Sequence, residues 1–401
     1  MHKPETCDIF CAVLDNYGDV GVSLRLARQL MHEHGIAVRL WVDDLASLRR
    51  LYPEGDLSIT TEPHDIEIGH WIFPFPEVEP AQLVIETFSC RTPESYITSM
   101  ALQTHKPVWI NLEHLSAEDW VAGCHCLPSP HPSLPLTQYF FFPGFTPKTG
   151  GLLLERDLLS QREAFQQDPQ AVQNFWGKLG IPHANNFEIR VSLFCYENFA
   201  LQSLLLAWAN SDTTILCLVP EGLVLPQVAD FFGRAHVTPG EVLKQNNLTV
   251  QILPFLTQPH YDELLWACDL NFVRGEDSCV RAQWAARPFV WHIYPQEDNA
   301  HIKKLTAFVR LYCCGLSQNA AQALLGFWNV WNQLPNQPAV SIQSAWHNLW
   351  THRKEIEQHA PAWAQQLSSN ELSLNLLLFA EGRLEDCKTA RNCKIARELE
   401  N

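Results

Sequence analysis

Short apolar runs alternate with amphipathic stretches along the first third of the chain. Runs that predict strands lie at 9–14, 38–42, 82–85 and 107–111. After the first run, Val22, Leu26 and Leu30 recur on one face, which predicts a helix that ends near Gly35. Strands and helices in this order are typical of a parallel sheet that is covered on both faces.

The same alternation returns in the second half of the chain. Predicted strands lie at 188–194, 214–219, 248–254, 269–274 and 289–293. Predicted helices lie between them at 200–209, 227–234 and 261–267, and a short one ends before Pro288. The chain has 401 residues, which exceeds one ordinary core. We therefore predict an α/β protein with two Rossmann-like domains in tandem.

Between the two halves, residues 123–151 are rich in proline and aromatic residues and have little periodicity, which predicts a long functional loop. We expect an N-terminal domain at 1–154, a linker at 155–180 and a C-terminal domain at 181–359. Helices around 360–390 are expected to pack back on the first domain. Residues 380–401 are expected to form a charged tail.

Composition argues against a nucleic-acid-binding protein, a membrane protein and a metal-binding protein. The net charge of −16 argues against nucleic acid as a partner, because nucleic-acid binders need a basic surface. No apolar run reaches membrane-spanning length, and the first residues lack the layout of a signal peptide, so we expect a cytoplasmic protein without a membrane anchor. The 13 cysteines are scattered through apolar runs, which favours buried thiols over a metal site.

The turn DNYGDVG at 15–21 follows the first predicted strand and opens a helix. It has only Gly18 and Gly21, so the three-glycine dinucleotide fingerprint is absent, as is a P-loop lysine. Asp15 and Asp19 flank Gly18 instead. They fit either catalytic acids or ordinary turn and helix N-terminal residues, and the residues alone favour the second reading.

A second candidate is RGEDS at 274–278, where a predicted strand ends and a helix begins. Arg274, Ser278 and the first amides of that helix could hold a diphosphate, with Glu276 facing a reacting centre. A helix cap with a neighbouring ion pair is the alternative. Two acids beside an arginine exceed what a cap requires, so we favour a functional site.

Two further sets of residues are ambiguous. The stretch YPQEDNAH at 294–301 fits a surface loop as well as a ligand loop. Phe194, Tyr196 and Phe255 are of a type that is more often core than ligand-binding. They do, however, follow predicted strands at the sheet edge where a planar base would lie.

Seven motifs together carry a resemblance to a known family. They are DNYGDVGVSLRLARQL, INLEHLSAEDW, FFFPGF, VSLFCYEN, LPFLTQ, RGEDS and WHIYPQEDNAH, spread from residue 15 to residue 301. The chain resembles glycosyltransferases of the two-domain GT-B type and is most similar to the protein-arginine rhamnosyltransferases called EarP. Members of that family transfer L-rhamnose from dTDP-β-L-rhamnose to one arginine of translation elongation factor P.

The resemblance implies a GT-B fold, with two Rossmann-like domains facing a central cleft, and an inverting, metal-independent transfer without a cofactor besides the co-substrate dTDP-β-L-rhamnose. It implies that Asp19 is the general base, that Asp15 supports it and that Glu276 is the second catalytic carboxylate. The implied donor-binding residues are Asn16, Tyr17, Gly18, Asp19, Tyr196, Gln258, Arg274, Gly275, Glu276, Asp277, Ser278 and Tyr294, with Phe194 and Phe255 around the thymine. Trp284 stands where many GT-B enzymes carry a ribose-binding glutamate, which is consistent with a deoxyribose donor.

Elementary chemistry agrees with an arginine acceptor, since a guanidinium has a pKa above about 12 and needs a carboxylate to take its proton before it can attack. Three alternatives stay open. A nicotinamide oxidoreductase would share the fold but needs the missing glycine fingerprint. A non-catalytic sugar-nucleotide or protein-binding module would not need three acids. A GT-B glycosyltransferase with another nucleotide sugar or acceptor is the nearest competitor.

Overall fold

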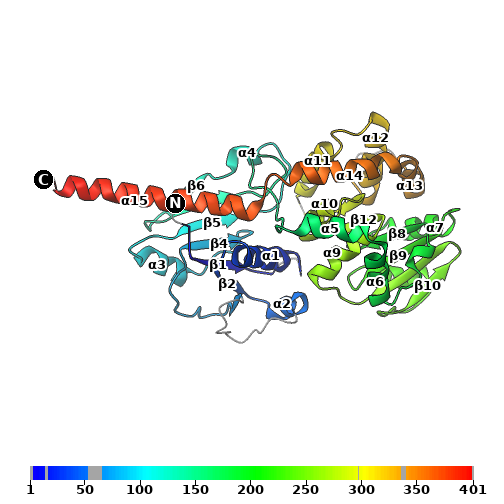
Figure 1. The fold of residues 1–401 in the computed structure, drawn as a ribbon, viewed down its shortest axis with the longest axis horizontal. Helices are drawn as coiled ribbons and strands as arrows, with labels where there is room; N and C mark the ends of the chain where they lie inside the picture. The colour runs from blue at the N-terminus through cyan, green and yellow to red at the C-terminus, as the bar shows by residue number, and fades with distance from the viewer. Residues whose placement is uncertain (1–2, 14–16, 53–65, 297, 336–339, 400–401) are drawn as a thin grey trace. The chain divides into compact units, whose positions relative to one another are not determined.

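A computed structural model describes residues 3–13, 17–52, 66–296, 298–335 and 340–399, with side chains described through Glu385. The chain divides into two compact units (Figure 1). Unit 1 consists of residues 1–155 together with 367–401, and unit 2 consists of residues 156–366. Each unit has its own largely parallel sheet, which confirms the predicted α/β class with two Rossmann-like sheets.

The sheet of unit 1 has the strand order β3-β2-β1-β4-β5-β7-β6, and all of its pairs are parallel except β6 with β7. The strands are β1 (Thr6–Cys11), β2 (Ala37–Val42), β3 (Glu67–His70), β4 (Leu83–Thr87), β5 (Val108–Leu112), β6 (Pro128–Pro130) and β7 (Thr137–Phe141). The helices are α1 (Gly18–His32), α2 (Leu45–Leu51), α3 (Glu94–Leu102), α4 (Val121–Cys124) and α15 (Leu372–Leu399). The strand order reverses between β1 and β4, and doubly wound sheets bind ligands at the carboxyl edge of such a switch point.

The sheet of unit 2 has the order β10-β11-β9-β8-β12-β13. Its strands are β8 (Ile189–Leu193), β9 (Ile215–Pro220), β10 (Val242–Gln245), β11 (Leu248–Leu253), β12 (Leu270–Arg274) and β13 (Phe289–His292). Its helices are α5 (Leu158–Gln167), α6 (Pro169–Lys178), the 3₁₀ turn Ala184–Asn186, α7 (Leu201–Ala209), α8 (Leu225–Phe231), α9 (Gln258–Ala267), α10 (Asp277–Trp284), α11 (Ala300–Tyr312), α12 (Gln318–Trp331), α13 (Ile342–Thr351) and α14 (Arg353–Leu367). Here the strand order reverses between β8 and β12.

The prediction of a long loop at 123–151 is wrong in part. Residues 128–130 and 137–141 form an antiparallel pair, and β7 also joins β5 in parallel register. Pro128 and Pro130 lie in β6 at the edge of the sheet, where a strand can tolerate residues that donate no ladder hydrogen bond. Because of these prolines, the sequence pattern did not predict the edge hairpin.

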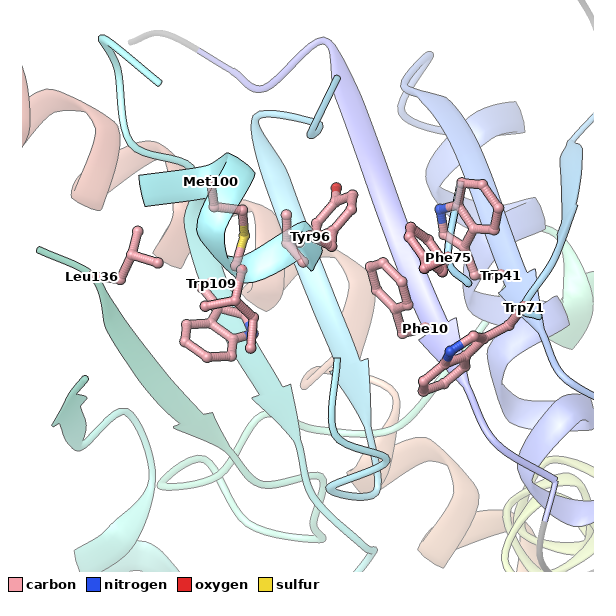
Figure 2. Close-up of a cluster of buried hydrophobic side chains, with 10 residues drawn as sticks. Phe10, Trp41, Trp71, Phe75, Tyr96, Met100, Trp109 and Leu136 are labelled. Atoms are coloured by element: carbon pink, nitrogen blue, oxygen red, sulfur yellow. The ribbon is translucent and has the colours of Figure 1, made fainter. Parts of the chain in front are cut away.

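One face of the unit 1 sheet carries a cluster of ten buried side chains, drawn in Figure 2. Phe10 of β1 lies in its middle, with its ring centroid 4.8 Å from that of Tyr96 and 5.7 Å from that of Trp71. Beneath this cluster the fully buried carboxylate of Asp8 accepts hydrogen bonds from Arg39 and from the hydroxyl of Tyr96. Apolar packing and one satisfied buried charge therefore fix the centre of the sheet.

Residues after 367 complete unit 1. Leu152 and Glu371 form a parallel bridge, and Asn370 Nδ2 donates to the carbonyl of Thr146 at 2.8 Å. The helix α15 packs against α1 and β5 (Figure 1), and the ring centroids of Phe379 and Tyr139 lie 5.2 Å apart. Unit 1 is therefore built from two segments that are separated in sequence by all of unit 2.

Gly151 makes this closure possible, and we expect Gly151→Ala to destabilise unit 1. Its φ is +82°, and a Cβ there would overlap the backbone carbonyl of Asn370. We expect the free energy of unfolding in urea to fall by about 3 kcal/mol. The matched control is Gly35→Ala, at φ +62° with no atom within 4 Å of the added Cβ, which should cost only about 1 kcal/mol. Equal losses would contradict the account.

Candidate active site

A buried arginine marks the switch point of unit 2. Arg274 is the last residue of β12 and is 7% exposed. Its guanidinium carbon lies 4.6 Å from the ring centroid of Phe194 and 4.8 Å from that of Tyr196, and both of these residues follow β8. The two strands that flank the switch point therefore place a cation against two aromatic rings, as cation–π contacts require.

This guanidinium is not fully satisfied. The Nη1 atom of Arg274 is buried and, within the described residues, has no hydrogen-bond partner. By contrast, the buried Arg281 donates from Nε and Nη2 to the two oxygens of Asp262, at 2.9 and 2.8 Å. Since buried charges are normally paired, a buried cation with an open donor is chemically able to bind an anion from outside the chain.

His292 lies beside Arg274, as the paired residue on β13. Its ring centroid is 5.3 Å from that of Tyr196, and its Nδ1 atom is buried without a hydrogen-bond partner among the described residues. Burial, and then the charge of Arg274, lower the pKa of His292 to about 4. His292 is therefore neutral near pH 7 and adds a second open polar atom to the same position.

The turn after Arg274 is held by its own side chains. Gly275 has φ +62°, and its carbonyl accepts a hydrogen bond from Trp291 Nε1 at 2.7 Å. The hydroxyl of Ser278 accepts from the backbone N–H of Arg274 at 3.0 Å and donates to the carbonyl of the same residue. Ser278 thus closes the turn, while Glu276 at the N-cap position of α10 makes no capping hydrogen bond. This helix start therefore lacks a side-chain cap, as an anion-binding helix terminus requires.

Glu276 pairs with a lysine instead. Lys304 of α11 donates from Nζ to Glu276 Oε1 at 2.7 Å, and the two side chains are only 17% and 20% exposed. A partly buried pair of this kind fixes the carboxylate in one place more firmly than a surface pair does. Lys304 thus holds the Glu276 carboxylate in place within the turn that follows Arg274.

The other predicted donor-binding residues of unit 2 are distributed around the same sheet edge. Tyr294 follows β13, is 53% exposed, and has its ring centroid 5.5 Å from that of Tyr196. Gln258 is buried at the start of α9. Phe255 is half-buried after β11, which lies two strands from β8 in the sheet. Asp277 is half-buried at the first position of α10.

In unit 1, the predicted residues that the structure describes lie at the start of α1. Asp19 is in the first turn of this helix and is 8% exposed. Tyr17 occupies the N-cap position and is anchored to α2, because Arg50 Nη1 donates to its hydroxyl at 2.9 Å. Gly18 begins the helix. Asp15 and Asn16 lie outside the described residues.

Sequence reasoning missed His292 and Lys304. His292 ends a strand in the motif WHIYPQEDNAH, so its place beside Arg274 could have been read from strand pairing. Lys304 lies inside a helix and carried no comparable signal. Trp284, which drew notice in the sequence, is fully buried in unit 2.

Two other features, a metal-ligand cluster and a membrane-spanning helix, are absent from the part of the chain that the structure describes. No three side chains of His, Cys, Asp or Glu gather there as metal ligands would. No helix there has the length and apolar character needed to cross a bilayer. A transfer without a metal ion stays a prediction.

Comparison with known proteins decides the family. Residues 7–381 match the family described as Elongation-Factor P (EF-P) rhamnosyltransferase EarP. The chain belongs to the EarP family. A protein-arginine rhamnosyltransferase of Pseudomonas putida is 46% identical over 381 residues, which cover 94% of this chain and 99% of the relative. One of Pseudomonas aeruginosa is 46% identical over 374 residues, covering 93% and 98%.

A solved structure agrees with this assignment. It is described as the structural basis for EarP-mediated arginine glycosylation of translation elongation factor EF-P. Its TM-score to this chain is 0.68 at 35% sequence identity, with 94% of this chain and 99% of that chain covered. The EarP assignment confirms the predicted GT-B class, so this EarP-family member is a glycosyltransferase with two Rossmann-like units.

The contrast between Arg274 and Arg281 generates a prediction. We expect Arg274→Met to weaken the binding of a nucleoside diphosphate such as dTDP about a hundredfold, because the open cation is lost. The same change should alter the free energy of unfolding by less than about 1 kcal/mol, since no buried carboxylate is left behind.

Arg281→Met is the matched control. It strands the buried carboxylate of Asp262 and should lower the free energy of unfolding by about 3 kcal/mol or more. Calorimetric titration with dTDP and urea unfolding measure the two quantities. A large loss of stability in Arg274→Met, with unchanged affinity for dTDP, would reverse the assignment.

Proposed function

We propose that this EarP-family member transfers L-rhamnose from dTDP-β-L-rhamnose to one arginine side chain of translation elongation factor P, with inversion at the anomeric carbon. The single observation that carries the donor half of this proposal is the buried guanidinium of Arg274 with its open Nη1 atom. Family membership supports the acceptor half.

In this proposal the diphosphate of the donor binds Arg274 and the uncapped amides at the start of α10. A diphosphate on a helix N-terminus gains from the helix dipole as well as from hydrogen bonds. The same groups stabilise the negative charge that develops on the leaving dTDP, so no metal ion is required for that step. Phe194 and Phe255 hold the thymine between their rings. Tyr196, Gln258 and Tyr294 contact the rest of the donor.

The acceptor guanidinium must lose a proton as it attacks. Asp19 is the proposed general base, since it is a buried carboxylate at the switch point of unit 1. Asp15 supports it, and Glu276 supplies the second carboxylate from unit 2. The nitrogen–carbon bond forms as the bond from the anomeric carbon to the diphosphate oxygen breaks. Attack on the face opposite the leaving group turns the β-linked donor into an α-linked product.

The proposal places the protein in the cytoplasm, where elongation factor P acts during translation. The thiols agree with a reducing compartment, since the 11 cysteines whose side chains the structure describes are all free.

The decisive experiment mixes the purified protein with dTDP-β-L-rhamnose and elongation factor P. Intact-mass analysis should show one added deoxyhexose of about 146 Da, and peptide mapping should place it on arginine. We expect Asp19→Asn to lower kcat at least about a hundredfold while the donor Kd stays within about threefold, because a base acts in the transition state.

The matched control for this prediction is Asp119→Asn, which changes an exposed carboxylate of unit 1 and should keep wild-type turnover. Transfer from a different nucleotide sugar only, or to a residue other than arginine, would replace the proposal by the nearest alternative. Normal turnover by Asp19→Asn would remove Asp19 as the base.

Lys304 allows a separate test of the role of Glu276. We expect Lys304→Met to lower kcat about tenfold or more, because the Glu276 carboxylate loses the partner that positions it. Lys304→Arg should retain most of the activity, since it restores a cation. Lys303→Met, which changes the exposed neighbour on the same helix, is the control and should have no effect. Equal behaviour of the two methionine variants would show that the pair is structural only.

A further inference from the structure

The loop after β4 adopts a conformation that its residues disfavour. Phe88, Ser89 and Arg91 have φ values of +55°, +56° and +62°. Side chains other than glycine rarely adopt this left-handed region, and each instance costs about 1–3 kcal/mol. Three of them within four residues is a concentration of strain of the kind that clusters where a protein binds or transforms a ligand.

Neighbouring groups hold this conformation from several sides. The buried carboxylate of Glu86 accepts hydrogen bonds from the backbone of Arg91 at 2.9 Å and from Thr92 Oγ1 at 3.0 Å. The N–H of Phe88 donates to the carbonyl of Leu112 at 2.8 Å. The N–H of Ser89 donates to Asn111 Oδ1 at 3.1 Å. Specific contacts on both flanks therefore hold the loop in its strained conformation. The loop is not a relaxed surface turn.

The loop lies at the switch point of unit 1. It leaves β4 next to β1, and Cys90 Sγ donates to the carbonyl of Phe10 near the end of β1, at 3.3 Å. Thr87 Oγ1 donates to the same carbonyl at 2.8 Å. Ser23 of α1 lies 3.4 Å from Thr87 Oγ1 and donates to the carbonyl of Asp19. The strained loop and the helix turn that carries Asp19 thus share one edge of one sheet.

At this edge the loop contacts the carboxylate of Glu113. Glu113, which follows β5, is half-buried. Its Oε1 atom accepts hydrogen bonds from Asn111 Nδ2 at 2.7 Å and from Ser89 Oγ at 3.4 Å. Both donors are neutral, and no cation of the described residues pairs with Glu113. Its charge is therefore held in position without being neutralised, which leaves an oxygen for a cationic ligand.

The residues that adjoin this contact in each segment form an aromatic pair. The ring of Phe88 stacks on that of His114, with centroids 4.5 Å apart and an angle of 14° between the planes. Phe88 is half-buried. Residue 88 has its left-handed φ directly after the end of β4. A planar cation can stack on such a ring while it donates to a carboxylate beside it.

We propose that Glu113 and Phe88 form the subsite that binds the guanidinium of the acceptor arginine and orients it toward Asp19. This inference rests on the proposed function and assigns a binding role that is separate from proton transfer. Glu113 accepts hydrogen bonds from one edge of the guanidinium, and Phe88 packs against its plane. The strained loop serves to bring both groups to the switch point.

A double-mutant cycle tests the subsite by binding alone, without turnover. Two forms of elongation factor P are used, the wild type and a variant in which methionine replaces the acceptor arginine. The affinity of each form is measured for the wild-type enzyme and for Glu113→Gln. Glutamine keeps the shape and can still accept from Asn111, so folding should be preserved. We expect Glu113→Gln to weaken binding of the arginine form about tenfold and to leave binding of the methionine form within about twofold.

Two further variants complete the design. Glu94→Gln changes an exposed carboxylate in the first turn of α3 and should show no coupling to the acceptor arginine. Phe88→Leu should raise the KM for the acceptor several-fold, with the Kd for dTDP unchanged. An equal effect of Glu113→Gln on both acceptor forms would overturn the subsite. The proposed function would fail separately, through absence of rhamnose transfer by the wild-type enzyme.

Discussion

Arg274 carries a positive charge into the interior of unit 2 and meets two aromatic rings there in place of a carboxylate. Burying a cation costs free energy unless partners recover it, and the rings of Phe194 and Tyr196 recover only part. Among the described residues no carboxylate pairs with this guanidinium, and His292 stays uncharged beside it. The folded unit is thus prepared for a negatively charged ligand at the cost of some stability.

The two units share one sheet topology but carry different charged groups at its switch point. Each sheet reverses its strand order once, between β1 and β4 in unit 1 and between β8 and β12 in unit 2. In unit 1 the carboxylates of Asp19 and Glu113 lie at that edge, whereas in unit 2 a buried guanidinium lies there, next to the pair of Glu276 with Lys304. Under the proposed function, the diphosphate of the donor meets the guanidinium of unit 2, and the guanidinium of the acceptor meets the carboxylates of unit 1. This division suits a reaction between two substrates of opposite charge.

Much of the fold could be predicted because strands that are buried on both faces read as apolar runs. The run 269–274 and the turn RGEDS gave the position of Arg274, and the pattern around Val22 gave α1. The edge hairpin of β6 and β7 was missed, because prolines and a short strand conceal period-two alternation. The candidate site could be predicted from the sequence mainly where a chemically distinctive residue lies near the end of a strand. Lys304 was not, because its role depends on a contact across 28 residues that no local pattern encodes.

The return of the chain to unit 1 has a consequence for biosynthesis. Gly151, Leu152 and Thr146 receive their partners from residues around Asn370 and Glu371, which a ribosome makes only after all of unit 2. The surface of the N-terminal sheet that later contacts α15 therefore stays uncovered while unit 2 is synthesised. Unit 1, although it begins first, is thus the last of the two units to be completed.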